Sequence, residues 1–457
     1  MQTEERPVKL YFISLGCDKN LVDSEMMITA LRKSGFVITD EEAQAEVIVV
    51  NTCCFIGDAK EESINTLLEM AEYKEQTVGV CRLLVAAGCL AQRYHQEIRT
   101  EIPEVDIIIG TMGYEALGET IRNALQKQQG VIECLKDINY LPEPLTDRDS
   151  MSGGYSAYLK IAEGCDKHCT YCVIPMVRGS YRSVPMENLL SQAEHLVKNG
   201  AKELILVAQE TTLYGVDLYG KKSLPELLKR LSEIEELRWL RIMYCYPEEI
   251  TDELIQAIRT LPKVCHYLDI PIQHGSDEVL RRMGRRTDRQ ELADRIASLR
   301  AEIPDIVLRT TLITGFPGEM EKDFACLCDF VQEMKFDRLG VFPYSQEEDT
   351  PAAEMPDQIP EEVKQDRRNE LMALQQQIAF AKSEAQIGRV LDVMVEGRLP
   401  EDQVYITRSY MDAPDVDGYV FVSTDWDLMS GDFLKVQITG ADEYDLIGEI
   451  IPEERIE

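Results

Sequence analysis

Short apolar runs alternate with longer amphipathic stretches over most of the chain. In the N-terminal third, strand-like runs occupy 9–16, 47–53, 82–90 and 105–110, with helical periodicity between them. A second series follows, with strand-like runs at 157–162, 203–208, 239–244, 267–272, 307–315 and 338–344. Alternating strands and helices predict parallel sheets covered by helices. Six successive units in the second series predict a βα barrel or an open part of one.

The pattern changes towards the C-terminus. A long helix is expected over 361–386, and short alternating segments follow at 391–398, 403–411, 418–423, 433–441 and 446–451. Period-two alternation with turn residues between the segments predicts a small antiparallel barrel. We therefore expect an open parallel-sheet domain at 8–126, a linker at 127–150, a six-unit partial barrel at 151–382 and a small β-barrel at 383–457.

The net charge indicates which kinds of partner the protein can bind. The 457 residues carry a net charge of -34, and positions 383–457 contain 18 acidic and 5 basic side chains. Such a surface repels phosphate backbones and attracts basic proteins. No apolar stretch is long enough for a membrane span, and the N-terminal residues lack the apolar core of a signal peptide. We therefore expect a cytoplasmic protein with no membrane contact.

Three of the 13 cysteines lie within eight residues: Cys165, Cys169 and Cys172. They follow the first strand of the second series, where catalytic loops of such folds lie. Three thiolates without a second cysteine pair fit an iron–sulfur cubane in which one iron keeps an open coordination position. A structural zinc site or a chance cluster of core cysteines is the alternative.

Cys17, Cys53 and Cys89 occupy equivalent places in the first domain, each at the C-terminal end of a predicted strand. In an open parallel sheet these ends converge on one crevice, so three distant thiols can meet there. Buried core cysteines are the alternative. Cys54 is expected to point away from Cys53 along an extended segment.

The loop EGCDKHCTYCVIP, with Tyr171 before its last cysteine, resembles the signature of the radical S-adenosylmethionine (SAM) superfamily. Together with SLGCDKNLVDSE, NTCCFIGDAKEESI, GCLAQRY, RGSYRSVP, ITGFPGE and PYSQEEDTPA, it resembles the methylthiotransferases over nearly the whole chain. This resemblance implies a methylthiotransferase domain with an auxiliary 4Fe-4S cluster, a radical SAM barrel with a second cluster, and a TRAM domain.

Carried over position by position, the resemblance assigns two sets of iron ligands. Cys17, Cys53 and Cys89 match the auxiliary-cluster ligands, and the ligands of the SAM-binding cluster are matched by Cys165, Cys169 and Cys172. Cys54 stands where relatives often have Gly or another small residue, so the choice between Cys53 and Cys54 stays open.

Four further residues are candidates for contacts with SAM: Tyr171, Gln209, Arg309 and Gly315. Gln209 follows the second barrel strand, Arg309 lies on the fifth as a carboxylate partner, and Gly315 permits close backbone approach. An ordinary turn or a packing role is the alternative for each. The five histidines show no metal-ligand spacing, and no catalytic residue is assigned beyond the cluster ligands.

Methylthiotransferases act mainly either on an adenosine of tRNA or on an aspartate of the twelfth protein of the small ribosomal subunit. The acidic C-terminal segment disfavours the tRNA, and SLGCDKNLVDSE, AQETTLYG and APDVDGYVFV resemble the ribosomal-protein branch. We expect methylthiolation of the aspartate β-carbon, with two 4Fe-4S clusters, SAM, and an electron donor such as flavodoxin or ferredoxin. The alternatives are a tRNA enzyme and a non-catalytic iron–sulfur scaffold for ribosome assembly.

Overall fold

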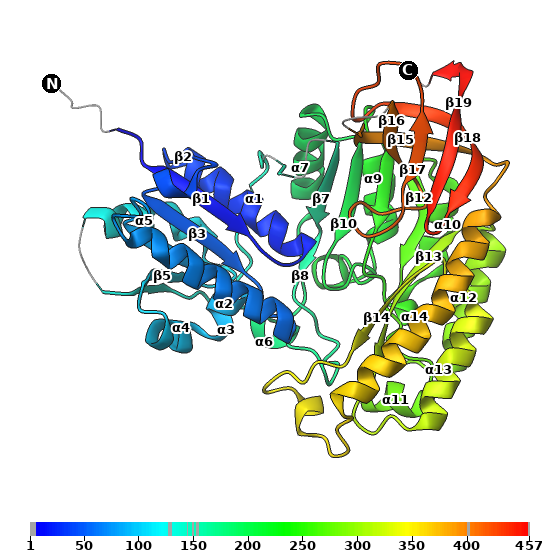
Figure 1. Ribbon diagram of the computed structural model, residues 1–457, viewed down its shortest axis with the longest axis horizontal. Coiled ribbons are helices and arrows are strands. Elements are labelled where there is room, and N and C mark those ends of the chain that lie inside the picture. Colours follow the sequence, from blue (N-terminus) through cyan, green and yellow to red (C-terminus); the bar gives the residue numbers. More distant parts are fainter. Residues whose placement is uncertain are drawn as a thin grey trace.

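A computed structural model describes residues 6–126, 130–143, 145–148, 150–151, 155–399 and 403–455. Figure 1 shows an N-terminal α/β unit, a larger central α/β unit and a C-terminal β-barrel beside the central sheet. The expected linker at 127–150 therefore lies partly outside the described residues, as do 152–154 of the expected partial barrel and 400–402 and 456–457 of the expected β-barrel.

The N-terminal unit is an open sheet of six parallel strands in the order β2-β1-β3-β4-β5-β6. Every residue of β3 and β4 is buried, because helices cover both faces. The strands are β1 Lys9–Ser14, β2 Val37–Ile38, β3 Val47–Thr52, β4 Leu83–Gly88, β5 Val105–Ile109 and β6 Ile132–Cys134. The helices are α1 Asp18–Lys33, α2 Gly57–Ala71, α3 Cys89–Arg93, α4 His95–Glu101 and α5 Leu117–Gln126, with short 3-10 turns at Glu42–Gln44, Glu72–Lys74 and Tyr114–Ala116.

The structure differs from the sequence-based elements in several places. Strand β6 lies inside the expected linker and pairs with β5; three residues are too few to show an alternating pattern. The strand expected over 267–272 runs instead from Val264 to Asp269, as β12. The strand ends before Pro271, which has no N–H to donate to a neighbouring strand. The sequence pattern places its start too late because Cys265 and His266 do not continue the apolar run.

The central unit is a second parallel sheet, and its strand order follows the sequence from β7 to β14. The described strands leave it open between β14 and β7, which confirms a partial barrel. Its strands are β7 Ser156–Lys160, β10 Glu203–Val207, β11 Trp239–Ile242, β12 Val264–Asp269, β13 Val307–Thr314 and β14 Arg338–Pro343. The covering helices are α7 Met186–Lys198, α9 Leu224–Ser232, α10 Asp252–Thr260, α12 Arg289–Glu302, α13 Glu321–Met334 and α14 Glu361–Glu384.

Shorter elements complete the central unit. A two-stranded antiparallel ribbon, β8 Ala162–Glu163 and β9 Arg182–Ser183, flanks the cysteine loop. The sequence pattern predicts neither these two short strands nor β2. The remaining pieces are α6 Ile174–Arg178, α8 Val216–Tyr219 and α11 Asp277–Arg282, with 3-10 turns at Pro247–Glu249 and Pro351–Glu354. In the described part of the chain, no helix is both long and apolar enough to cross a lipid bilayer.

The C-terminal strands close into a barrel in the order β15-β16-β17-β19-β18, which confirms the predicted fold class. Neighbouring strands are antiparallel except β17 and β19, which are parallel. The strands are β15 Val390–Arg398, β16 Val404–Ser409, β17 Val420–Ser423, β18 Phe433–Asp442 and β19 Asp445–Arg455.

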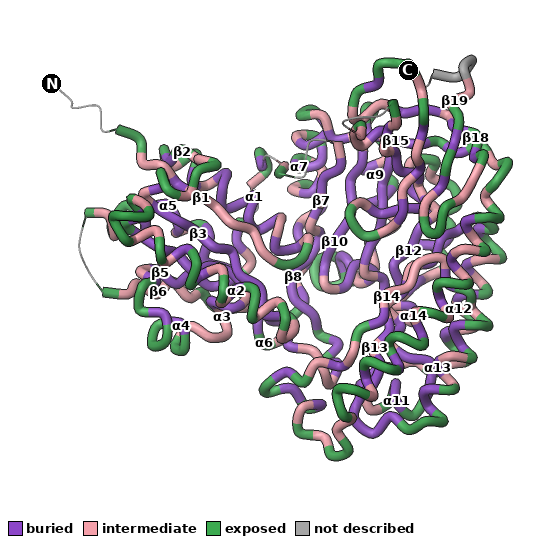
Figure 2. The backbone as a smooth tube through the Cα atoms, in the orientation of Figure 1, coloured by how far each residue is buried: buried purple, intermediate pink, exposed green. Residues whose placement is uncertain are grey.

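The two faces of the central sheet are covered differently. Side chains such as Leu204 and Leu240 pack with the surrounding helices, whereas Ile205 and Tyr267 on the other face pack with the C-terminal barrel. Figure 2 shows continuous burial from the central strands into that barrel. The C-terminal barrel therefore fills part of the concave face of the open sheet.

Buried ion pairs join the C-terminal barrel to the central sheet. Glu203 lies 2.5 Å from Arg408 Nη2 and 2.8 Å from Arg241 Nε. Burial by itself raises the pKa of Glu203, but the two guanidinium groups hold it at about 2. Asp412 likewise pairs with Arg338, and Asp417 pairs with both Arg338 and Arg309. Part of the C-terminal acidity is therefore internal and not available to a partner.

Candidate functional site

The first cysteine group lies on the loop between β8 and α6. The loop is held by backbone hydrogen bonds from Cys165 N to Gly179 O at 3.1 Å and from Thr170 N to Met283 O at 3.0 Å. Cys165 and Cys169 are buried and Cys172 is half-buried. Burial raises the pKa of Cys165 to about 11, and burial together with the neighbouring thiols raises that of Cys172 to about 12. The three cysteines therefore lie close enough to affect one another's pKa, in a loop that is largely buried.

Aromatic and cationic side chains surround this loop group. Cys169 Sγ lies 3.6 Å from Tyr246 Oη, and the Arg285 guanidinium lies 4.2 Å from the centre of the Tyr246 ring. Tyr171 stands edge-on to Phe316 at 6.3 Å, and burial raises its pKa. Tyr171 is thus part of the packed wall beside the thiols.

Glu210, just beyond β10, is a buried carboxylate with an unused acceptor. Its Oε1 accepts a hydrogen bond from Thr212 N at 2.9 Å, whereas Oε2 has no hydrogen-bond partner among the described residues. Burial raises its pKa to about 7, and its charge in turn raises the pKa of Cys165. A cation near the loop group would find a ready acceptor here.

The other residues expected to contact SAM have different surroundings. Gln209 donates from Nε2 to Glu163 at 2.9 Å, and its buried Oε1 has no partner among the described residues. Arg309 lies 3.2 Å from Asp269 and 3.6 Å from Asp417. At Gly315, with φ of +70°, an added Cβ would lie 2.3 Å from Lys364 Cγ. Gln209 thus has an unused acceptor, whereas Arg309 joins two domains and Gly315 accommodates α14.

The second cysteine group lies at the C-terminal ends of three adjacent strands. Strand register pairs Ser14 with Asn51 and Thr52 with Gly88, which brings the loops of Cys17, Cys53 and Cys89 side by side. An added Cβ at Gly16 would lie 2.6 Å from Cys53 Cβ, and one at Gly88 would lie 2.3 Å from Asn51 Oδ1. A glycine therefore precedes two of the three cysteines because the strand ends press against each other.

Cys53 and Cys54 are both buried. Cys53 N donates to Ser63 Oγ at 2.9 Å, and Ser63 Oγ donates back to Cys53 O at 2.9 Å. Cys54 packs in the core shared with α3, and burial raises its pKa to about 12. Burial and then the charges of Cys54, Cys53 and Cys17 raise the pKa of Cys89. Both adjacent thiols thus lie near Cys89, so the structure leaves both available as ligands.

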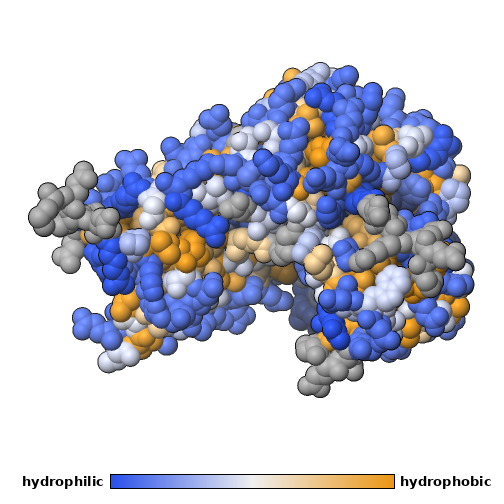
Figure 3. All heavy atoms as spheres, turned by 90° about the horizontal axis from the view of Figure 1, so that it is seen from above, coloured by the Kyte–Doolittle hydropathy of each residue, from blue (hydrophilic) through white to orange (hydrophobic). Residues whose placement is uncertain are grey.

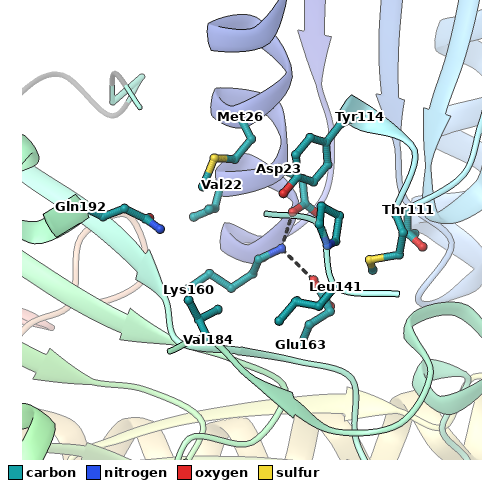
Figure 4. Close-up of a pocket in the computed structure, with 12 residues that line it drawn as sticks. Val22, Asp23, Met26, Thr111, Tyr114, Leu141, Lys160, Glu163, Val184 and Gln192 are labelled. Carbon is teal, nitrogen blue, oxygen red and sulfur yellow. Dashed lines mark hydrogen bonds and ion pairs between the residues drawn. The ribbon is translucent and has the colours of Figure 1, made fainter. Parts of the chain in front are cut away.

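A buried polar network joins the central unit to the N-terminal unit beside Cys89. Arg178, at the end of α6, donates from Nη1 to Asp23 at 2.5 Å and from Nη2 to Cys89 Sγ at 3.2 Å. Lys160 pairs with Asp23 and, at 2.7 Å, with Glu163; Figure 4 shows its side chain pointing between these carboxylates in a small pocket between α1 and β7. No single sequence motif contains this network, because its members come from four separate segments.

A second contact between the domains lies beside Cys17. The ammonium of Lys19 lies 3.2 Å from the centre of the Tyr244 ring, and Tyr244 Oη donates to Asp18 at 3.2 Å. Tyr244 has a φ of +58°, a value that bulky residues rarely adopt. The end of β11 is therefore held in an unusual conformation against the Cys17 loop.

Both cysteine groups offer thiols as donors, the ligands that hold iron–sulfur clusters. Across the described ranges, no three His, Cys, Asp or Glu side chains are placed to hold one metal ion. In a cubane each thiolate binds a different iron, whereas all ligands of a structural zinc site meet at one ion. Each group supplies three thiols, which leaves one iron of a cubane free.

Family models match successive parts of the chain. Residues 9–110 match the Uncharacterized protein family UPF0004, residues 159–331 the Radical SAM superfamily and residues 387–451 the TRAM domain. The structure of the radical SAM methyltransferase TsrM from Kitasatospora setae is similar in fold, with a TM-score of 0.53 at 13% identity, covering 74% of this chain and 73% of that one. Fold and cysteine loop define a radical SAM enzyme, a class that uses SAM and a 4Fe-4S cluster.

Full-length relatives specify the class further. The ribosomal protein uS12 methylthiotransferase RimO of Lachnoclostridium phytofermentans is 60% identical over 441 residues, which cover 96% of this chain and 99% of that protein. RimO of Acetivibrio thermocellus is 50% identical over 451 residues, covering 97% and 99%. The chain belongs to the RimO family of radical SAM methylthiotransferases. The resemblance found in the sequence is confirmed, and an enzyme is favoured over a non-catalytic scaffold.

Proposed function

We propose that this enzyme adds a methylthio group to the β-carbon of an aspartate in ribosomal protein uS12. The observation that carries the proposal is the contact of Arg178, at the end of the helix that follows the 165–172 loop, with Cys89 of the second cysteine group. The curated relatives that match nearly the full chain are named for this substrate. A tRNA adenosine is the alternative substrate.

We assign one cluster to each cysteine group. Cys165, Cys169 and Cys172 hold the SAM-binding cluster, and Cys17, Cys53 and Cys89 hold an auxiliary cluster. When bound, SAM and the two clusters supply a radical that removes hydrogen from the substrate carbon and a methylthio group that replaces it. The protein itself supplies the thiol ligands and the dry surroundings.

We assign the amino-acid end of SAM to the residues that follow β10. Glu210 has an unused buried oxygen that fits an ammonium group, and the preceding residue, Gln209, also has an unused oxygen, Oε1. The Tyr171 ring forms part of the wall. Arg309 and Gly315 contribute indirectly, because they hold the C-terminal barrel and α14 in place.

Charge supports a basic protein partner. In the C-terminal barrel, exposed acidic residues remain after the internal pairs are set aside, among them Asp392, Asp425, Asp427 and Glu443. Figure 3 shows a mainly hydrophilic surface that is hollowed between the N-terminal unit and the rest of the molecule. The proposal includes an electron donor such as flavodoxin or ferredoxin, a cytoplasmic location and no direct nucleic-acid substrate. It retains the domain limits 8–126, 151–382 and 383–457.

Mass spectrometry of cells that lack the gene tests the substrate. We expect uS12 to lose its methylthio group while bulk tRNA keeps its own, and re-expression of the gene to restore the modified uS12. Loss of the methylthio group from tRNA alone would contradict the assignment. With the purified, reconstituted enzyme, 5′-deoxyadenosine should form only when SAM and a reductant are both present.

A further inference from the structure

Arg178 connects the two cysteine groups physically. It ends α6, the helix that directly follows the 165–172 loop along the chain. Its side chain leaves that loop and reaches the N-terminal domain, where only 2% of the residue remains exposed. Val177 O, its neighbour, accepts a hydrogen bond from Thr111 Oγ1 at 3.2 Å. The position of the guanidinium is therefore set by both domains.

The two ends of the guanidinium have different partners. Nη1 donates to Asp23 at 2.5 Å and contacts Glu163 at 3.3 Å, whereas Nη2 donates to Asn20 Oδ1 at 3.1 Å and to Cys89 Sγ at 3.2 Å. A planar guanidinium can donate hydrogen bonds to the carboxylates and to the Cys89 sulfur at the same time in one fixed geometry, which a lysine ammonium cannot.

The charges around Arg178 are balanced without the thiol. Lys160 also pairs with Asp23 and Glu163, so two cations face two carboxylates. The two carboxylates therefore anchor Nη1, while Nη2 is directed at sulfur.

We propose that Arg178 is a positioning residue that sets the reduction potential of the auxiliary cluster through the hydrogen bond from Nη2 to the Cys89 sulfur. The inference rests on the proposed function, because it requires a cluster at Cys17, Cys53 and Cys89. Hydrogen bonds to cluster sulfurs and nearby positive charge favour the reduced state, and burial strengthens both effects. The same side chain fixes the auxiliary ligand relative to the SAM-cluster loop.

The test uses anaerobically reconstituted full-length enzyme. Iron is counted, and the potential of each cluster is measured by redox titration followed by electron paramagnetic resonance. The SAM-binding cluster is identified by the change in its spectrum when SAM is added. Arg178→Met and Arg178→Lys are compared with Arg148→Met. Arg148 is buried at the same interface, pairs with Glu25 of α1 and, within the described part of the chain, makes no hydrogen bond or ion pair to a cysteine.

We expect Arg178→Met to lower the auxiliary-cluster potential by at least a tenfold change in the reduction equilibrium, or about 59 mV for one electron. The SAM-cluster potential should not change, Arg178→Lys should give a smaller shift, and Arg148→Met should give none. Unchanged potentials in Arg178→Met, or an equal shift in Arg148→Met, would overturn the inference. If Arg178→Met loses the auxiliary cluster, an unshifted potential in Arg178→Lys overturns it. Wild-type enzyme with a single cluster would instead refute the proposed function.

Discussion

The two cysteine groups are built in opposite ways. One occupies a single loop, so its spacing is set within eight residues of sequence, whereas the other is assembled from three strand ends separated by long stretches of chain. In the second group, the strand register and the close packing at Gly16 and Gly88 set the relative positions of the cysteines. In the first group, local sequence spacing sets them. The loop group should therefore keep its geometry when distant residues are substituted, whereas the group formed by three strand ends depends on the packing of its whole domain.

The charged neighbours differ as well. The loop group lies near Glu210, a buried carboxylate with an unused oxygen, whereas Cys89 accepts a hydrogen bond from Arg178. An unused acceptor suits a site that binds a cationic ligand, and a committed donor suits one that stabilises negative charge on sulfur. The two groups are therefore suited to different tasks.

The largest effect is expected from removing one thiol in each group. Cys165→Ala should abolish both SAM cleavage and methylthio transfer, because the SAM-binding cluster loses a ligand. Cys17→Ala should abolish transfer but spare reductant-dependent formation of 5′-deoxyadenosine. Both products are measured by chromatography and mass spectrometry with a uS12 peptide. Identical results for the two variants in both assays would contradict the division of tasks.

The same contrast explains what the sequence could predict. The loop group follows from its spacing, and the three strand ends follow from the alternation of strands and helices. Arg178 could not be assigned, because its partners Asp23, Glu163 and Cys89 come from other segments and only folding brings them together. Arg309 was expected as a carboxylate partner, but no local pattern could show that one carboxylate belongs to the C-terminal barrel.

Glu210 provides the next test, through the pH dependence of stability. Burial raises its pKa from 4.5 to about 7, so between these values the folded protein binds a proton that the unfolded chain releases. Glu210 thus lowers the free energy of unfolding as pH rises from about 4.5 to 7. Glu210→Gln should remove this loss, making the SAM-free enzyme more stable than wild type by about 3 kcal/mol at pH 8 and by little at pH 4.5. Denaturant unfolding of both proteins across this range measures the difference.

Glu249→Gln is the matched control. Glu249 pairs with Lys167 and Lys222. Burial raises the pKa of Glu249, but hydrogen bonds from these two lysines lower it overall. That substitution should therefore destabilise the enzyme at neutral pH. SAM should also bind Glu210→Gln more weakly, because the carboxylate that faces its ammonium has lost its charge. Equal pH profiles for wild type and Glu210→Gln would show that Glu210 is paired.

The smallest of the three effects should come from Gly88, which tests whether the assembled group depends on close backbone approach. Its φ of 88° and ψ of -150° belong to a region that other residues avoid, and an added Cβ would press against Asn51 and Thr52. Gly88→Ala should destabilise the N-terminal domain by about 2 kcal/mol. It should also reduce iron bound at the auxiliary site while leaving the SAM-binding cluster intact, as measured by iron content and by the spectral response to SAM.

Gly35→Ala separates strain from contact in the same domain. Gly35 also has a positive φ, +83°, but a Cβ added there meets no atom within 4 Å. Its replacement should lower stability without loss of auxiliary iron, because strain at a distance does not separate the strand ends. Full retention of both clusters in Gly88→Ala would show that the close fit at Gly88 is dispensable. The assembled group would then be as tolerant as the loop group, and the contrast between them would reduce to sequence spacing alone.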